Sequence, residues 1–348
     1  MRIAIVNDLR IAQEILRRAV ALMPGASVAW VAADGLEALA ACKRDKPDLI
    51  LMDMVMPVMD GAVATRAIMK ECACPILVVT STIEGNLSLV YEALSAGAID
   101  AVQTPQFDAA GAITGIDTLI RKSRVALAAT ASFTSQRHVS SAAAMPLANT
   151  LSQRRGARTL LLAIGSSTGG PQALSVVLGG LTNHASHCTI IVQHIDISYA
   201  AGLAAWLTGE IKKPVRIALE GEQLQSGLIL VAASDDHLVI RNGRVHYVRE
   251  PIDQIYRPSV DALFHSLATD ESVKGTAVLL TGMGRDGAEG LRALRTAGWQ
   301  TIAQDQNSSV VWGMPGAAVA LGAAMQILPL NAIGGAASRT LGGAVAPS

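Results

Sequence analysis

The chain of 348 residues has few aromatic side chains, only 3% of the total, and it carries no net charge. Basic and acidic residues number 28 each, so bulk charge does not hold the protein to nucleic acid or to an anionic membrane. So few aromatic rings also argue against stacking platforms for single-stranded nucleic acid. We therefore expect no nucleic-acid partner.

Cysteine is equally scarce, with four residues in the whole chain: Cys42, Cys72, Cys74 and Cys188. They are too few for a disulfide scaffold, and they lack the second ligand pair that a zinc site needs. A signal peptide is not expected either, because the apolar run after Arg2 has only four residues. We expect reduced thiols and a cytoplasmic location.

A long uninterrupted apolar run is missing as well. No charged residue occurs between positions 306 and 338, but glycine and proline break up this stretch at Gly313, Pro315, Gly316, Gly322 and Pro329. A membrane-spanning helix needs about 20 mostly apolar residues. We expect two buried elements with a turn around residues 312–315, and no direct insertion into a membrane.

What the chain does have is hydrophobic residues, 51% of the total, arranged as short strands that alternate with helices. Over residues 1 to about 120 the expected strands are 2–7, 28–32, 48–53, 76–80 and 99–102, with helices that include 11–22 and 35–42. The alternation resumes over 158–345, with strands 159–164, 188–193, 228–232, 276–281 and 301–303 and helices 171–178 and 288–297. The turn Asn242-Gly243 predicts a hairpin. This order favours an α/β protein with parallel sheets covered by helices on both faces.

Residues 121–157 interrupt this order. They contain no acidic residue and nine alanines, which predicts a mildly basic, flexible linker that is helical at its start. The simplest interpretation is a connector without a function of its own. The expected organisation is therefore a domain over 1–120, a linker over 121–157 and a second domain over 158–345.

Polar residues follow the strands of the first domain. Asn7 and Asp8 come after the first strand, Asp53 comes after the third, and Thr80 ends the fourth. The carboxyl ends of parallel strands meet at one edge, where clustered oxygens suit Mg²⁺ and a carboxylate can attack phosphorus. The alternative is that Asp8 and Asp53 merely cap loops, and spacing alone does not decide between the two.

A resemblance favours the first interpretation. Residues 1 to about 120 resemble the receiver domain of two-component response regulators in segments 5–8 (IVND), 53–61 (DMVMPVMDG), 79–81 (VTS) and 96–100 (AGAID). The resemblance implies a flavodoxin-like fold in which Asp53 accepts a phosphoryl group from a CheA-type histidine kinase. It also implies that Mg²⁺ is held by Asn7, Asp8, Asp53 and the Val55 carbonyl, and that Thr80 and Thr104 sense the phosphoryl group.

Two positions depart from the receiver pattern. Asn7 stands where many receivers carry a second carboxylate, so it brings one negative charge less to the metal. Thr104 stands before Pro105, where receivers usually carry a lysine, and a hydroxyl group does not replace a cation. We expect that Asp53 is still phosphorylated, with altered metal affinity or altered coupling to conformation. The rival hypothesis is a receiver that works without phosphate.

A serine lies at a glycine turn in the second domain. Residues 165–170 (GSSTGG) follow a strand and precede a helix, and they place Ser167 in a G-x-S-x-G pattern that lifts a hydroxyl clear of the backbone. Free N–H groups at the helix start suit an oxyanion, although such turns also cradle phosphate or serve as plain loops. His194 ends a buried strand and Asp286 follows another, so a base and an orienting group are available. The chain order Ser, His, Asp differs from that of lipase-type hydrolases.

The segment around Asp286 also permits another interpretation. Residues 282–287 (GMGRDG) fit G-x-G-x-x-G after a strand, with Asp305 at the end of the next strand, as in a nicotinamide-dinucleotide site. Three facts disfavour it. The unit lies near the C-terminus, Asp286 would bring a negative charge close to a pyrophosphate, and the serine turn would have no role.

A second resemblance covers residues 158 to about 345, which look like the catalytic domain of chemoreceptor protein-glutamate methylesterases, the CheB family. It is carried by segments 163–171 (AIGSSTGGP), 192–194 (VQH), 256–261 (YRPSVD), 280–287 (LTGMGRDG) and 301–305 (TIAQD). Asn7, Thr104 and the sequence after His194 make the chain most similar to the WspF subfamily of the Wsp surface-sensing pathway. The resemblance implies a Rossmann-like domain that follows the receiver in the chain. Both domains are then doubly wound parallel sheets.

This resemblance implies hydrolysis of glutamyl methyl esters on a methylated chemoreceptor, opposite to a receptor methyltransferase, with possible deamidation of glutamine. Ser167, His194 and Asp286 would form the catalytic triad, and the N–H groups of Thr168 and Met283 would hold the oxyanion. The esterase chemistry would need no cofactor. The remaining alternatives are a weakly active adaptor that works through its receiver and the nicotinamide enzyme described above.

Overall fold

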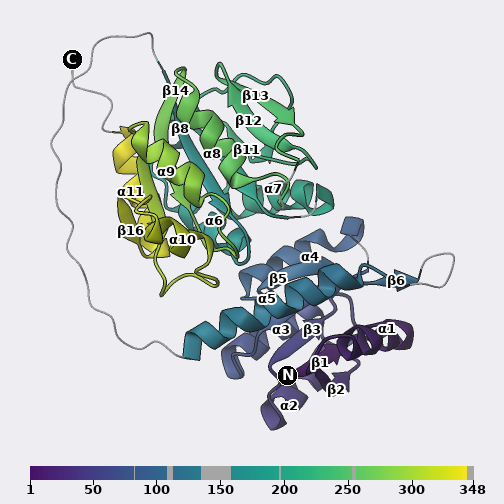
Figure 1. Ribbon diagram of the computed structural model, residues 1–348. Helices are drawn as coiled ribbons and strands as arrows, with labels where there is room; N and C mark the ends of the chain where they lie inside the picture. Colours follow the sequence, from purple (N-terminus) through teal and green to yellow (C-terminus); the bar gives the residue numbers. More distant parts are fainter. Residues whose placement is uncertain (82, 108–112, 135–157, 196, 253–255, 343–348) are drawn as a thin grey trace. The chain divides into compact units, whose positions relative to one another are not determined.

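The computed structural model describes residues 1–81, 83–107, 113–134, 158–195, 197–252 and 256–342. The chain divides into two compact units, Met1–Gln136 and Arg137–Ser348, which are described separately below (Figure 1).

The first unit contains a five-stranded parallel sheet in the order β2-β1-β3-β4-β5. Its strands are β1 (Arg2–Val6), β2 (Ser27–Ala32), β3 (Leu49–Met52), β4 (Ile76–Thr80) and β5 (Asp100–Gln103). Its helices are α1 (Arg10–Ala21), α2 (Gly35–Arg44), α3 (Gly61–Glu71), α4 (Ile83–Ser95) and α5 (Ile116–Thr134), and β6 (Gln106–Phe107) pairs with β7 (Ile113–Thr114). The strand order reverses between β1 and β3, the place where doubly wound sheets bind ligands.

The register at this point sets the site of the first unit. Val6 of β1 pairs with Met52 of β3, so Asn7 and Asp53 follow their strands at the same level. Both strands are almost completely buried, as expected for a parallel sheet covered on both faces. The flavodoxin-like fold predicted from the sequence is confirmed.

The second unit contains a seven-stranded parallel sheet in the order β10-β11-β9-β8-β14-β15-β16. Its strands are β8 (Thr159–Ser166), β9 (Cys188–Gln193), β10 (Arg216–Ile217), β11 (Ile229–Val231), β14 (Val273–Leu279), β15 (Gln300–Gln304) and β16 (Gln326–Leu328). Its α-helices are α6 (Gly170–Gly179), α7 (Ile197–Ile211), α8 (Val260–Thr269), α9 (Ala288–Thr296), α10 (Met314–Ala320) and α11 (Leu330–Gly342), and η1 (His184–Ser186) is a short 3₁₀ helix. This is the predicted Rossmann-like arrangement.

A separate hairpin joins β12 (His237–Arg241) to β13 (Arg244–Val248). Asn242 and Gly243 have φ values of 53° and 70°, as a tight hairpin turn with two left-handed residues requires, so the predicted turn is confirmed.

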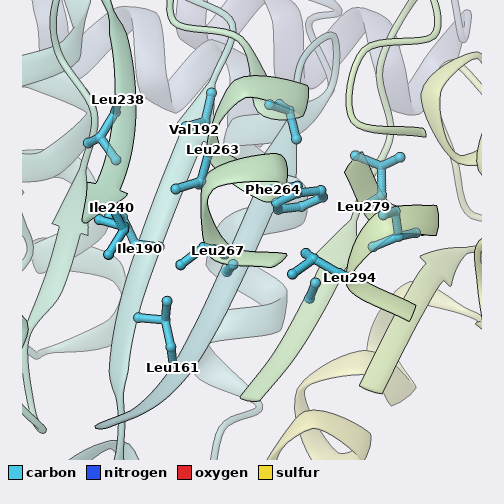
Figure 2. Close-up of a cluster of buried hydrophobic side chains, with 14 of the residues drawn as sticks. Leu161, Ile190, Val192, Leu238, Ile240, Leu263, Phe264, Leu267, Leu279 and Leu294 are labelled. Carbon is cyan, nitrogen blue, oxygen red and sulfur yellow. The ribbon is translucent and has the colours of Figure 1, made fainter. Parts of the chain in front are cut away.

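One apolar cluster of the second unit lies between the sheet and α8. Leu263, Phe264 and Leu267 project from α8 toward side chains of β8 and β9 that include Leu161 and Ile190 (Figure 2). All five are fully buried. This packing fixes the start of α8 near the carboxyl ends of the strands, where the candidate site lies.

Some expectations differ from the structure in detail. The stretch 306–338 holds three elements, α10, β16 and α11, rather than two, because β16 adds a short edge strand beside β15. No described helix is both long enough and apolar enough to cross a bilayer. The expected domain end at residue 120 falls inside α5, which continues to Thr134, and the rest of the expected linker, 135–157, lies outside the described residues.

Candidate active site

Three adjacent strands of the second unit carry the predicted catalytic residues at their carboxyl ends. In the register, Gly165 of β8 pairs with Val192 of β9 and with Leu279 of β14. Ser167 and His194 therefore follow their strands at the same level, and Asp286 lies in the loop after β14. The three strands are neighbours at the point where the strand order reverses.

His194 and Asp286 are in direct contact. The Nε2 atom of His194 lies 2.7 Å from Oδ2 of Asp286, and their side chains are only 7% and 4% exposed. Because a carboxylate only accepts hydrogen bonds, Nε2 is the N–H nitrogen of the neutral ring. The Nδ1 atom is then the basic nitrogen, and it is buried without a hydrogen-bond partner among the described residues.

The start of α8 holds the Asp286 carboxylate. Ser259, the N-cap residue of α8, donates its hydroxyl hydrogen to Oδ1 at 2.8 Å. The N–H groups of Val260 and Asp261 donate to Oδ2 and Oδ1 at 2.6 and 3.0 Å. Burial alone would raise the pKa of Asp286, but the bond from His194 and these further donors lower it below its usual value. Asp286 is therefore built to remain an anion.

The serine turn is tightly braced from both sides. Gln193 Nε2 donates to the carbonyl oxygens of Ser167 and His194 at 2.8 and 3.1 Å, and its Oε1 accepts from the Ser166 hydroxyl at 2.6 Å. A Cβ on Gly282 would lie 2.8 Å from Cβ of Ser167, so only glycine permits this approach. The turns after β8, β9 and β14 are thereby held together around Ser167.

The two predicted oxyanion donors lie in these same turns. Thr168 follows Ser167 directly and Met283 follows Gly282. Within the described part of the chain, neither backbone N–H donates to a protein acceptor. Thr168 is buried and Met283 is 39% exposed, so the two residues differ in their access to water. These free donors suit an oxyanion.

The nicotinamide interpretation loses its main support here. Asp305 Oδ1 accepts hydrogen bonds from the backbone N–H and the hydroxyl of Ser308, at 2.9 and 2.6 Å. The Asp305 carboxylate therefore caps its own loop, and this oxygen is not left unpaired as a ligand for a ribose hydroxyl. The glycines of residues 282–287 instead permit close packing within the protein, with Gly282 against Ser167, Gly284 against Tyr256 and Gly287 against Val260.

Sequence reasoning missed two supporting residues, Ser259 and Gln193. Ser259 had a signal, because a serine directly before an apolar helical segment is a typical N-cap. Gln193 had no such signal, since its partners Ser166 and Ser167 come from a different strand and are defined only by the register.

The first unit brings its predicted residues together in another way. Asn7 Nδ2 donates to Asp53 Oδ2 at 2.9 Å, while Asn7 Oδ1 accepts the N–H of Leu9 at 2.8 Å. The amide orientation is fixed by that backbone donor. Met54 N–H donates to the other Asp53 oxygen at 2.7 Å. Burial raises the pKa of Asp53 to about 6, and the neighbouring Asp8 adds to this rise.

This donor set partly fits the predicted Mg²⁺. Asp8 and Asp53 supply the one or two carboxylates that Mg²⁺ takes, and the Val55 residue is half exposed. The oxygen of Asn7 is already engaged by Leu9, so in this arrangement Asn7 offers Asp53 an N–H group rather than offering a metal an oxygen. Among the described residues, no group of three or more His, Cys, Asp and Glu side chains is arranged to hold a metal.

The two predicted sensing residues lie at the ends of β4 and β5. Both are buried, and Thr104 N–H donates to the carbonyl of Thr80 at 2.9 Å. The hydroxyl of Thr104 is buried with no hydrogen-bond partner in the part of the chain that is described. Lys122 forms an ion pair with Asp100, at the start of β5 and therefore at the opposite end of that strand from Thr104.

Fold and site together define a two-domain α/β protein with a receiver-type unit followed by a hydrolase-type unit. A family model described as "CheB methylesterase" matches residues 162–337, and one described as "Response regulator receiver domain" matches residues 3–110. The chain belongs to the CheB methylesterase family and carries an N-terminal receiver domain.

Relatives resemble the chain over nearly its whole length. A Pseudomonas putida protein named "Protein-glutamate methylesterase/protein-glutamine glutaminase of group 3 operon" is 48% identical over 96% of this chain and 98% of its own. A Burkholderia pseudomallei protein named "Protein-glutamate methylesterase/protein-glutamine glutaminase 2" is 47% identical over 96% of this chain and 95% of its own. The Thermotoga maritima CheB catalytic domain matches 53% of this chain and 99% of its own, with 31% identity and a TM-score of 0.48. The WspF subfamily stays a prediction.

Proposed function

We propose that this enzyme hydrolyses glutamyl methyl esters on the cytoplasmic helices of a chemoreceptor, and that phosphorylation of Asp53 raises its activity. The observation that carries the esterase proposal is the buried His194–Asp286 pair beside the braced Ser167 turn. The pair leaves one basic ring nitrogen without a partner among the described residues, as proton transfer from a serine needs. The family and the names of its relatives support the substrate class.

The mechanism follows from these groups. Ser167 Oγ attacks the ester carbonyl, and its proton passes to Nδ1 of His194. Asp286 holds the ring tautomer and stabilises the imidazolium, while the N–H groups of Thr168 and Met283 bind the oxyanion. His194 then protonates methanol as it leaves, and water releases the acyl group by the same steps in reverse. Glutamine side chains pass through the same type of intermediate, so deamidation fits the same machinery.

The product of ester hydrolysis changes the charge of the receptor, and this change carries the signal. Hydrolysis leaves a carboxylate on a receptor helix, and the added negative charge changes helix packing and the activity of the attached kinase. A methyltransferase would reverse the change. Since the proposed substrate is the cytoplasmic part of a receptor, we expect the enzyme in the cytoplasm.

Control by the receiver would begin at Asp53. One of its carboxylate oxygens attacks the phosphorus of a phosphohistidine on a CheA-type kinase, so an O–P bond forms as the N–P bond breaks and the kinase histidine leaves. Mg²⁺, held by Asp8, Asp53 and the Val55 carbonyl, would neutralise the phosphoryl charge. Asn7 orients the Asp53 carboxylate, and the hydroxyls of Thr80 and Thr104 would respond to the phosphoryl oxygen.

The esterase proposal is tested by methanol release from methylated receptor in membranes. Ser167→Ala is expected to abolish release, and His194→Gln to lower it by about 10³-fold or more, while circular dichroism of both variants stays that of the wild type. Ser175→Ala is the matched control, because Ser175 is a half-buried serine of α6 whose hydroxyl donates to the Gln172 carbonyl. Undiminished release by Ser167→Ala would remove that residue from the mechanism.

A further inference from the structure

Tyr256, which lies just before α8, has no role in the mechanism given so far. Its ring stacks on the imidazole of His194, with 4.3 Å between the ring centroids and 5° between the planes. The tip of the tyrosine reaches the turn after β14, where a Cβ on Gly284 would come within 3.3 Å of the tyrosine hydroxyl oxygen. The tyrosine thus extends from the catalytic imidazole to the residue next to Met283.

We propose that Tyr256 is a positioning residue of the esterase, which fixes the plane of the His194 ring and stabilises the imidazolium formed during the reaction. The inference rests on the proposed function, because it deepens the account of the same site.

Stacking by Tyr256 restricts the orientation of the imidazole. The bond between His194 and Asp286 fixes the direction of one ring nitrogen, but the ring can still turn about that line. A parallel aromatic ring at stacking distance removes this freedom, because turning would push the imidazole edge into the tyrosine face. With the plane fixed, the direction of the Nδ1 lone pair is fixed as well. Proton transfer from a serine depends on that direction.

Stacking by Tyr256 also stabilises a positive charge on the His194 ring. His194 is neutral before the reaction and carries a positive charge once it has taken the serine proton. A cation within about 6 Å of a tyrosine ring centroid is attracted by the negative face of the ring, and more strongly where water is excluded. The side chain of His194 is only 7% exposed, so this attraction is weakly screened. Tyr256 would therefore favour the charged state that the transition state resembles.

Two other charged groups lie near the imidazole. Asp286 contacts His194 directly, and Asp261 lies close to Asp286, with its carboxylate held by the N–H of Gly290 at 2.7 Å. Burial raises the pKa of Asp261. Neither carboxylate has a hydrogen bond to Tyr256. Substitutions of Tyr256 therefore test the contact between its ring and the imidazole.

The experiment compares Tyr256→Phe, Tyr256→Trp and Tyr256→Leu in the full-length protein. Methanol release is measured from pH 5 to pH 9, and the His194 ring is titrated by NMR on ¹⁵N-histidine-labelled protein, with His194→Gln to assign its signal. Tyr247→Leu is the matched control, because Tyr247 is a half-buried tyrosine of β13 whose hydroxyl bonds to the Ala218 carbonyl. Thermal melting reports whether each variant is folded.

The expected result separates a stacked ring from simple packing. Tyr256→Phe keeps the aromatic face, so its rate stays within about twofold of wild type and its NMR midpoint does not move. Tyr256→Leu loses the face, so plateau kcat/KM falls about five- to tenfold. Its NMR midpoint and the acidic limb of its rate profile both move roughly 0.5–1 unit to lower pH. Tyr256→Trp keeps an aromatic face that attracts cations more strongly, so both midpoints move to higher pH. This variant still tests the proposal if Tyr256→Leu does not fold.

An unchanged His194 midpoint in folded Tyr256→Leu would overturn the charge argument, and unchanged kcat/KM as well would overturn the proposal. A rate as low in Tyr256→Phe as in Tyr256→Leu would assign the effect to the hydroxyl and contradict it too. If wild-type protein releases no methanol but the NMR midpoints shift as expected, the proposed function fails while the stacking effect on His194 stands.

Discussion

Asp53 and Asp286 occupy equivalent places in the two domains, yet their chemistry is opposite. Each follows a buried strand beside the point where a doubly wound sheet reverses its order, and each residue as a whole, backbone included, is 7% exposed. The pKa of Asp53 rises to about 6, whereas that of Asp286 falls below its usual value. Equal burial therefore does not decide the charge of a carboxylate.

Hydrogen-bond donors account for the difference. Asp286 accepts from the His194 ring, the Ser259 hydroxyl and two backbone N–H groups at the start of α8. Asp53 accepts from the Asn7 amide and from the N–H groups of Met54 and Val55, and it has Asp8 as a neighbour of like charge. A carboxylate with a full set of donors suits a permanent anion in a triad. One with fewer donors suits a site that is completed by a metal and a phosphoryl group.

The largest effect is expected from removing the anion of the well-supported site. Asp286→Asn keeps the shape of the side chain but loses the charge, and it can reverse the ring tautomer that leaves Nδ1 basic. We expect kcat for methanol release to fall by about 10³–10⁴-fold with little change in KM. Phosphotransfer to Asp53, measured with labelled ATP and kinase, should not change. A loss below tenfold would contradict the role given to Asp286.

The same change at the other site should stabilise the protein. A carboxylate with a raised pKa costs stability when ionised, so the cost is absent below about pH 4 and complete above the folded value near 6. Asp53→Asn should therefore stabilise the receiver by about 1–3 kcal/mol at pH 7 in EDTA, and by much less at pH 4. Hydrogen exchange of the β1 and β3 amides measures this. Destabilisation at pH 7 would show that the ionised Asp53 is well satisfied.

A smaller effect is expected from weakening one donor to Asp286. Ser259→Ala removes the hydroxyl bond to Oδ1 and the N-cap bond to the Ala262 N–H. We expect a loss of about 1 kcal/mol in unfolding free energy and about a tenfold fall in kcat. Ser266→Ala, in the same helix but away from Asp286, is the control. If kcat falls equally in both variants, the effect belongs to the helix and not to the carboxylate.

The pH dependence should also differ between the two sites. Because the folded pKa of Asp286 is depressed, its stabilising contribution is present above about pH 4 and is lost as the pH falls through the lower folded value. Acid titration followed by hydrogen exchange should therefore open the loop after β14 at low pH in wild type. The same loop in Asp286→Asn should show no such dependence, and an identical profile would contradict the assignment.

The smallest effect is expected at Thr104. Its hydroxyl is buried without a partner among the described residues, so Thr104→Val should leave stability unchanged or raise it by up to about 1 kcal/mol. Basal methanol release should not change. If the hydroxyl serves the phosphorylated state, activation by kinase and ATP should fall several-fold. Full activation of the valine variant would remove Thr104 from the switch.

Sequence reasoning predicts the two candidate sites because strand ends are marked by a change from apolar to polar residues. Asp53, Ser167 and His194 each follow a buried strand directly, so a parallel sheet alone brings them to an edge. The partners that set their chemistry are less visible. Ser259 reaches Asp286 across 27 residues, and the bond of Asn7 to Asp53 depends on an amide orientation fixed by Leu9. The stacking of Tyr256 depends on a loop conformation that no periodic pattern encodes.

The central claim, a serine esterase controlled by phosphorylation of Asp53, is tested most directly by one measurement. Methanol release from methylated receptor membranes is followed with and without kinase, ATP and Mg²⁺, for wild type, Asp53→Ala and Ser167→Ala. The account predicts release that rises with kinase in wild type, stays at the basal rate in Asp53→Ala and is absent in Ser167→Ala. Release that rises equally in wild type and Asp53→Ala, or that persists in Ser167→Ala, would contradict it.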